Sequence, residues 1–308
     1  MKRLPILKSH SNKHLWIIFF VVLPLTVAAR FHHIKNLLEP AFGFYASRDW
    51  TVTALGVLLT LTSGFYLCYS FINRKSETGA LIYKKGKVKS RVTVVLSFFL
   101  ALMLLSDVYA CYQIIMDNFQ DFQYSMRLSD DTGIFAEGMF TNLMKTGIFP
   151  ALMEGLFAVP SAVFAVVFGV QHMKKTSHKP MRLLAIFPSL WLVMRTIYHF
   201  TNTLSFMRVS ELFYELAAMA FTLIFLINFA QAYSSINENR DDWALTGVGF
   251  PAALFALMGF LSRLLIFVTG NSENLTAQAP LDFMELALAL FILSVLRVRV
   301  REKKGFLT

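Results

Sequence analysis

Residues 244–269 read ALTGVGFPAALFALMGFLSRLLIFVT and contain a single charged residue, Arg263. About 20 consecutive apolar residues are enough for a helix to cross roughly 30 Å of hydrocarbon. In that layer a helix satisfies its backbone polar groups within the segment itself. The stretch therefore predicts a transmembrane helix, and similar stretches recur along the chain.

Seven further apolar runs lie along the 308 residues, and charged residues make up only 16% of the chain. A typical soluble domain carries about 25%. The sequence therefore predicts an all-α, polytopic bundle of eight transmembrane helices, in which residues 1–308 form one integral membrane domain. The predicted spans lie near residues 15–30, 51–72, 92–116, 148–170, 182–204, 209–233, 244–269 and 281–297. The acidic and aromatic segment 117–147 is expected to be an interfacial helix or lid with a solvated acidic face.

The positive charges are distributed unevenly between the predicted loops. Of the 29 lysines and arginines, 21 lie in the two terminal segments and in 73–91, 171–182 and 234–243, whereas 6 lie in the alternate loops. Cytoplasmic loops carry such an excess, so both termini are expected in the cytoplasm of a cell membrane, plasma or inner. The formal net charge of +10 then reflects topology and anionic lipid head groups, not nucleic acid.

The first apolar run allows a second interpretation. Basic residues precede it and it ends in Val27, Ala28 and Ala29, which also resembles a secretory signal with a small-residue cleavage site. Cleavage there would leave seven helices and an external N-terminus. We expect the run to be retained as the first helix.

Two helix pairs share a charge pattern. The segments 212–217 (LFYELA) and 282–287 (DFMELA) are alike, and each follows a span with one arginine, Arg195 or Arg263. Transporters are often built from internal repeats. The pattern predicts a parallel hairpin repeat of 182–233 and 244–297, with chance resemblance between apolar helices as the alternative.

Ionisable residues within the spans are the main indication of function, because charges there are costly and are often functional. At 1.5 Å per residue, they fall in one outer layer of the bilayer. Matched depth predicts that Arg195 pairs with Glu215 and that Arg263 pairs with Glu285. The expected site is an outward-open polar cavity lined by the third to eighth spans, and its candidate ligand-binding or ion-coupling residues are Asp107, Glu154, Arg195, Tyr198, His199, Glu215, Arg263 and Glu285.

Four acidic residues face two arginines and one histidine in this set, which favours a small cationic or zwitterionic ligand, or proton coupling through His199. The leading interpretation is a small-molecule transporter or permease. A membrane-embedded sensor or assembly subunit is the alternative, because buried ion pairs also hold helices together. The sequence has no zinc-protease, nucleophile-elbow or phosphate-loop motif, so an intramembrane enzyme is less expected, and no cofactor or metal is predicted. Cys68 and Cys111 are expected to be packing residues.

Overall fold

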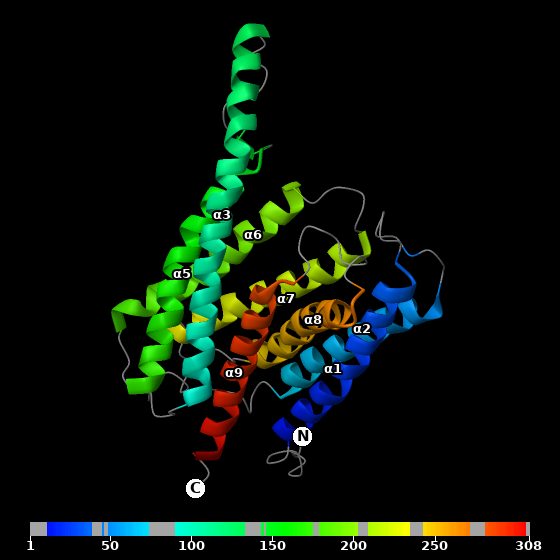
Figure 1. Cartoon of the computed structure of the whole chain (residues 1–308). Helices are drawn as coiled ribbons and strands as arrows, with labels where there is room; N and C mark the ends of the chain where they lie inside the picture. Colours follow the sequence, from blue (N-terminus) through cyan, green and yellow to red (C-terminus); the bar gives the residue numbers. More distant parts are fainter. Residues whose placement is uncertain are drawn as a thin grey trace. The chain divides into compact units, whose positions relative to one another are not determined.

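The structure, a computed structural model, describes residues 11–38, 45, 49–73, 90–132, 143–144, 146–174, 179–202, 209–234, 243–271 and 281–305. These residues are almost entirely helical (Figure 1), with one isolated bridge between Leu38 and Tyr45. The helices are α1 (Ser11–Asn36), α2 (Trp50–Ile72), α3 (Arg91–Thr132), α5 (Ile148–Lys174), the 3₁₀ helix η3 (Lys179–Ile186), α6 (Phe187–Asn202), α7 (Val209–Ser234), α8 (Trp243–Val268) and α9 (Phe283–Gly305).

Six helices in the described part of the chain are long and apolar enough to cross a bilayer, namely α1, α2, α3, α5, α7 and α8. Many apolar side chains on these helices are exposed, as lipid-facing residues are. Examples are Leu102 and Leu105 on α3 and Leu152 and Leu156 on α5. The all-α prediction is confirmed, and the fold is that of a multi-pass integral membrane protein.

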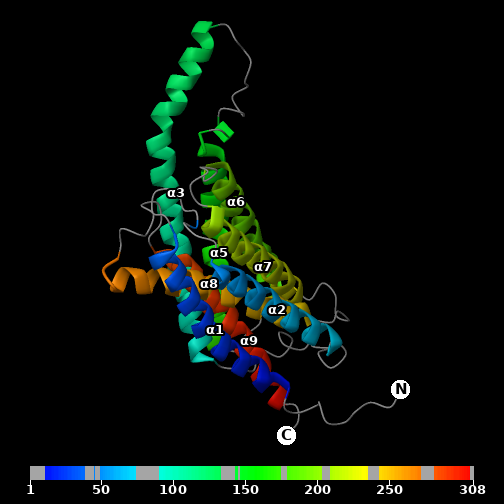
Figure 2. The ribbon, with the colours of Figure 1, turned by 90° about the vertical axis from the view of Figure 1, so that its right-hand side faces the viewer.

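Helix α3 differs from the prediction. It continues past residue 116 to Thr132 as one helix of 42 residues, so residues 117–132 do not form a separate interfacial helix. The physical reason is that no proline or glycine interrupts residues 91–132, so nothing in this stretch favours a break. At 1.5 Å per residue α3 is about 63 Å long, and it runs well beyond the end of α5 (Figures 1 and 2).

The chain divides into two compact units. Unit 1 contains residues 1–82, 208–225 and 239–308, and unit 2 contains residues 83–207 and 226–238. Unit 1 therefore holds α1, α2, α8, α9 and the first part of α7, and unit 2 holds α3, α5, η3, α6 and the last part of α7.

Helix α8 is the centre of unit 1. It packs against α1, α2 and α9, and 67% of the residues in its most apolar stretch are buried. A helix that is apolar on all sides is expected in such a buried position.

Helix α2 is joined to both α8 and α1. Its Tyr66 ring stacks on Phe250 of α8, with ring centroids 4.9 Å apart, and the Tyr66 hydroxyl donates to the carbonyl of Leu15 on α1. Asp49 caps α2 by accepting from the Thr51 N–H, which holds the pKa of the Asp49 carboxyl below its ordinary value.

Unit 2 is built on α5, which packs against both α3 and α6. Near one end of α5, Phe164 and Phe168 pack on the rings of Phe229 and Tyr233 from α7. The buried Tyr233 hydroxyl donates to the side-chain carbonyl of Gln171. This aromatic group joins α5 to α7. It lies at the opposite end of α5 from Glu154.

Candidate functional site

One charged cluster lies in unit 2 around Arg195 of α6. The Arg195 Nη1 atom is 2.6 Å from Asp107 Oδ1 and 3.3 Å from Glu154 Oε1. The indole N–H of Trp191 donates to Asp107 Oδ2 at 2.8 Å. A charge left alone in the membrane is costly, so the guanidinium and the two carboxylates stabilise one another.

The helices explain why these side chains meet. Trp191 and Arg195 are four residues apart on α6 and therefore lie on one face. Asp107 comes from α3 and Glu154 from α5, the helix that contacts both α3 and α6. Glu154 is only 4% exposed and Trp191 is fully buried, so the cluster is closed on the α5 side.

A second charged cluster lies in unit 1 around Arg263 of α8. Arg263 donates a hydrogen bond to Glu215 of α7, and its Nη1 atom lies 3.6 Å from Glu285 of α9. A β-carbon added at Gly259 would lie 3.1 Å from Glu285 Oε2. The absence of a side chain at Gly259 therefore lets the Glu285 carboxylate come close to the α8 backbone.

Arg30 of α1 adds a second guanidinium to this part of unit 1. It is 3% exposed, it donates to the Tyr45 hydroxyl at 3.0 Å, and it lies over the Tyr214 ring at 4.7 Å from the centroid, a cation–π distance. Arg30 is not among the site residues predicted from the sequence, because the predicted first span ends at residue 30. Helix α1 continues six residues further, to Asn36, and carries Arg30 inside the unit.

A small pocket joins the second cluster to Arg30. Its polar lining consists of Arg30, Tyr214, Glu215, Ser262, Arg263 and Glu285, and its apolar lining includes Phe255 and Met258. The cavity volume of the pocket is about 10 Å³. That is room for about one water molecule, so a larger ligand would have to displace side chains.

The structure brings the predicted site residues together in two groups and changes one predicted pair. The Arg263–Glu285 pair is confirmed. The Arg195–Glu215 pair is wrong, because Glu215 pairs with Arg263 and Arg195 pairs with Asp107 and Glu154. Depth along a helix axis does not specify which helix is the neighbour.

The remaining predicted residues, Tyr198 and His199, lie on α6 within about one turn of Arg195. Both are half-buried, and their ring centroids are 6.4 Å apart. The expected lining also changes, because α1 contributes Arg30 to the unit 1 pocket, whereas the sequence predicted a lining from the third to eighth spans. The single outward-open cavity and the ligand-binding role of all eight residues stay predictions.

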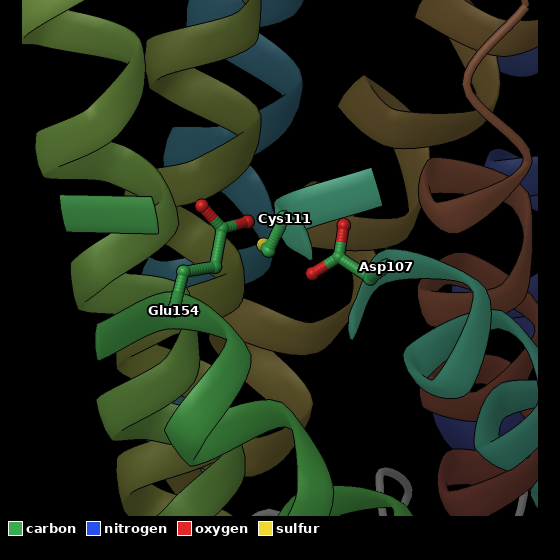
Figure 3. Close-up of side chains that lie close together, drawn as sticks. All are labelled: Asp107, Cys111 and Glu154. Carbon is green, nitrogen blue, oxygen red and sulfur yellow. The ribbon is translucent and has the colours of Figure 1, made fainter. Parts of the chain in front are cut away.

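Cys111 lies beside the unit 2 cluster. Its side chain is 4% exposed, and its sulfur and one oxygen each of Asp107 and Glu154 all lie within 4.8 Å of one another. Figure 3 shows the three side chains converging. This group is not apparent from the sequence, because a lone cysteine on an apolar helix has no recognisable metal spacing and its contact with Glu154 depends on how α3 packs on α5.

The fold and these clusters define a multi-pass helical membrane protein with buried charges in each of two units. Comparison with known proteins gives no matching family model, no matching curated protein and no matching solved structure. The function must therefore be argued from the chemistry of the clusters.

Proposed function

We propose that this protein is a permease that binds a small zwitterionic or cationic molecule at the pocket of unit 1. The observation that carries the proposal is the lining of that pocket, in which Arg30, Arg263, Glu215 and Glu285 surround one space. Two guanidiniums and two carboxylates offer a counterpart to each end of a zwitterion. Intramembrane charges of this kind commonly mark substrate or ion pathways.

The small free space indicates how such a ligand would bind. A ligand ammonium would replace Arg263 as the partner of Glu215 or Glu285, while a ligand carboxylate would pair with a guanidinium. This exchange keeps every buried charge compensated, which low-dielectric surroundings require. The apolar side chains of Phe255 and Met258 would contact the uncharged part of the ligand, and the Tyr214 hydroxyl would hydrogen-bond to one of its charged groups.

The same proposal includes eight membrane spans and cytoplasmic termini. Helix α6 alone is 16 residues, about 24 Å long, but η3 leads into it with 8 further residues, so the two together would be long enough to cross the hydrocarbon. The uneven distribution of lysine and arginine supports cytoplasmic termini in a plasma or inner membrane, and the basic cytoplasmic segments would contact anionic lipid head groups.

A second candidate function is a membrane-embedded sensor or assembly subunit. The water-sized free space favours it, since Arg263 already has two carboxylate partners and these ion pairs could serve to hold α7, α8 and α9 together. In that case the cluster would contribute to stability and no solute would cross the bilayer.

A binding screen tests the proposal. The purified protein would be heated with glycine betaine and L-alanine as zwitterions, choline and putrescine as cations, and acetate and phosphate as anions. A ligand present at 100 times its Kd stabilises the folded state by about 2.7 kcal/mol. We expect a zwitterion or cation to raise the unfolding midpoint and the anions to leave it unchanged. A midpoint that no zwitterion or cation raises would contradict the proposal.

Two further experiments locate the binding site and separate the two candidate functions. Tyr214→Phe keeps the ring over Arg30 and removes only a hydroxyl, so it should fold and bind more weakly, whereas the matched Tyr233→Phe in unit 2 should leave binding unchanged. Counterflow of the labelled binding compound into proteoliposomes then distinguishes transport from sensing. Uptake above that of protein-free vesicles supports the permease, and binding without uptake supports the sensor.

A further inference from the structure

Asp107, Cys111 and Glu154 in unit 2 form a group with no role in the proposed function. One carboxylate oxygen from Asp107, one from Glu154 and the Cys111 sulfur lie within 4.8 Å of one another. Figure 3 shows the three side chains. We propose that this group binds a divalent metal ion with affinity for thiolate, of the Zn²⁺ or Cd²⁺ kind. The site lies outside the unit 1 pocket and does not depend on the permease proposal.

The packing of α3 on α5 creates the group. Asp107 and Cys111 are four residues apart on α3 and share one face, while Glu154 comes from α5. A β-carbon added at Gly155 would already touch the Cys111 β-carbon at 3.4 Å. The bare backbone at Gly155 therefore allows the two helices to approach closely at this level.

The thiol distinguishes this group from an ordinary ion-pair cluster. The Arg195 guanidinium accounts for the two carboxylates, but it leaves the sulfur unused. Cys111 is 96% buried, since its exposure is 4%, and its thiol has no hydrogen-bond partner among the residues that the structure describes. The side chain nevertheless lies between Glu154 and Asp107, with its sulfur on the Glu154 side (Figure 3). A buried, unpartnered sulfur aimed between two carboxylates is a third metal ligand in position.

The charges suit a divalent cation. Two carboxylates exceed the one guanidinium that pairs with them, and the thiol ligates a metal as the thiolate after losing its proton. Three anionic ligands, Arg195 and one divalent cation then sum to zero charge. Neutrality matters here because an uncompensated charge is costly in the membrane.

The distances and surrounding donors also suit such an ion. Zinc lies about 2.0–2.2 Å from oxygen ligands and about 2.3 Å from sulfur. Each of the three ligand atoms would therefore have to move toward the ion by about 1 Å or less. Trp191 and Arg195 donate to the two oxygens of Asp107, and hydrogen bonds of this kind orient ligating carboxylates. Three protein ligands leave one position of a tetrahedral ion open for water or another small ligand. Thiolate favours Zn²⁺ over the hard cations Mg²⁺ and Ca²⁺.

Cadmium titration of the full-length, tag-free protein tests the site, because Cd²⁺ bound to thiolate gives an ultraviolet charge-transfer band. We expect one Cd²⁺ per chain, no band in Cys111→Ser and an unchanged band in Cys68→Ser, the matched control at the exposed cysteine. Glu154→Gln should weaken Cd²⁺ binding about tenfold or more, since it removes a ligand and even outer partners of ligands contribute about 10–100-fold.

Other outcomes would overturn the proposal. These are the absence of the band in wild type, a band that persists in Cys111→Ser, and a band that disappears in Cys68→Ser. If Cys111→Ser does not fold, X-ray absorption on the zinc-loaded wild type decides the matter without a variant. One sulfur and at least two oxygens around Zn²⁺ support the site, and a shell of nitrogen and oxygen alone contradicts it.

Discussion

At the scale of residues, each unit contains one arginine held by two carboxylates from two other helices. In unit 2 Arg195 contacts Asp107 and Glu154, and in unit 1 Arg263 contacts Glu215 and Glu285. A guanidinium presents several donors in a fixed plane, so one side chain can pair with two acids. Arg30 adds a second positive charge to the unit 1 pocket, so that two arginines balance two carboxylates there. In unit 2, Arg195 contacts two carboxylates and balances the charge of one of them.

Arg263→Met should destabilise the protein by about 3–5 kcal/mol, because removing one partner of a buried ion pair leaves the other charge uncompensated. Adding Glu215→Gln and Glu285→Gln to the same chain should restore part of that loss, since no unpaired carboxylate then remains. Denaturant titration in bicelles measures the free energy of unfolding. An Arg263→Met variant as stable as wild type would show that the ion pairs do not stabilise unit 1.

Trp191→Phe should cost about 1.5–3 kcal/mol, the range for hydrogen bonds to charged groups, because Asp107 loses the indole donor while an aromatic ring stays in the core. Trp16→Phe is the matched control, since its described contacts are with aromatic rings. The free energy of unfolding of both variants decides the prediction. Equal losses would mean that ring volume, and not the hydrogen bond to Asp107, stabilises the site.

The sequence predicted which ionisable residues lie within the apolar helices, with the exception of Arg30, because charges stand out in apolar runs. It predicted the Arg263–Glu285 pair, but not the partners of Arg195 and Glu215. The rise along a helix places Arg195 and Glu215 at one depth, but it does not specify which helices are neighbours or which way each face turns. Cys111 was missed for the same reason, since its proximity to Glu154 depends on the contact between α3 and α5.

At the scale of elements, apolar runs predicted the helix bounds closely where turn-forming or polar residues flank them. The predicted span 51–72 is α2 (Trp50–Ile72) and the predicted span 209–233 is α7 (Val209–Ser234). The prediction failed at α3, because hydropathy reports where the hydrocarbon ends and not where the helix ends. A helix can continue beyond the hydrocarbon where no proline or glycine interrupts it, as in residues 117–132.

The contact of α8 with α2 gives an element-scale prediction. A β-carbon at Gly247 would lie 3.2 Å from the Ser70 β-carbon and 3.5 Å from the Leu67 α-carbon, so Gly247→Leu should force the two helices apart. Overpacking of this kind costs about 1–3 kcal/mol. Gly64→Leu on α2 is the control, because nothing lies within 4 Å of a β-carbon there. Thermal unfolding should separate the two variants, and equal midpoints would refute the close contact.

At the scale of the whole molecule, topology connects the charge pattern with the length of α3. The basic segment 73–91 precedes α3, and residue 130 lies about 58 Å from Arg91 along the helix. The hydrocarbon is only about 30 Å thick. If the basic segment lies in the cytoplasm, the far end of α3 must project beyond the opposite surface.

Reporter fusions test this topology. Fusions after residues 85 and 308 should give a cytoplasmic signal, because the basic segments resist translocation, and a fusion after residue 130 should give an external one. A tag at residue 1 should be protected from external protease if α1 is retained, as its buried contacts with α2 and α8 favour. An external signal at residue 85 would invert the map. A cytoplasmic signal at residue 308 combined with loss of the tag at residue 1 from the purified protein would instead indicate that the first apolar run is removed, which leaves seven spans.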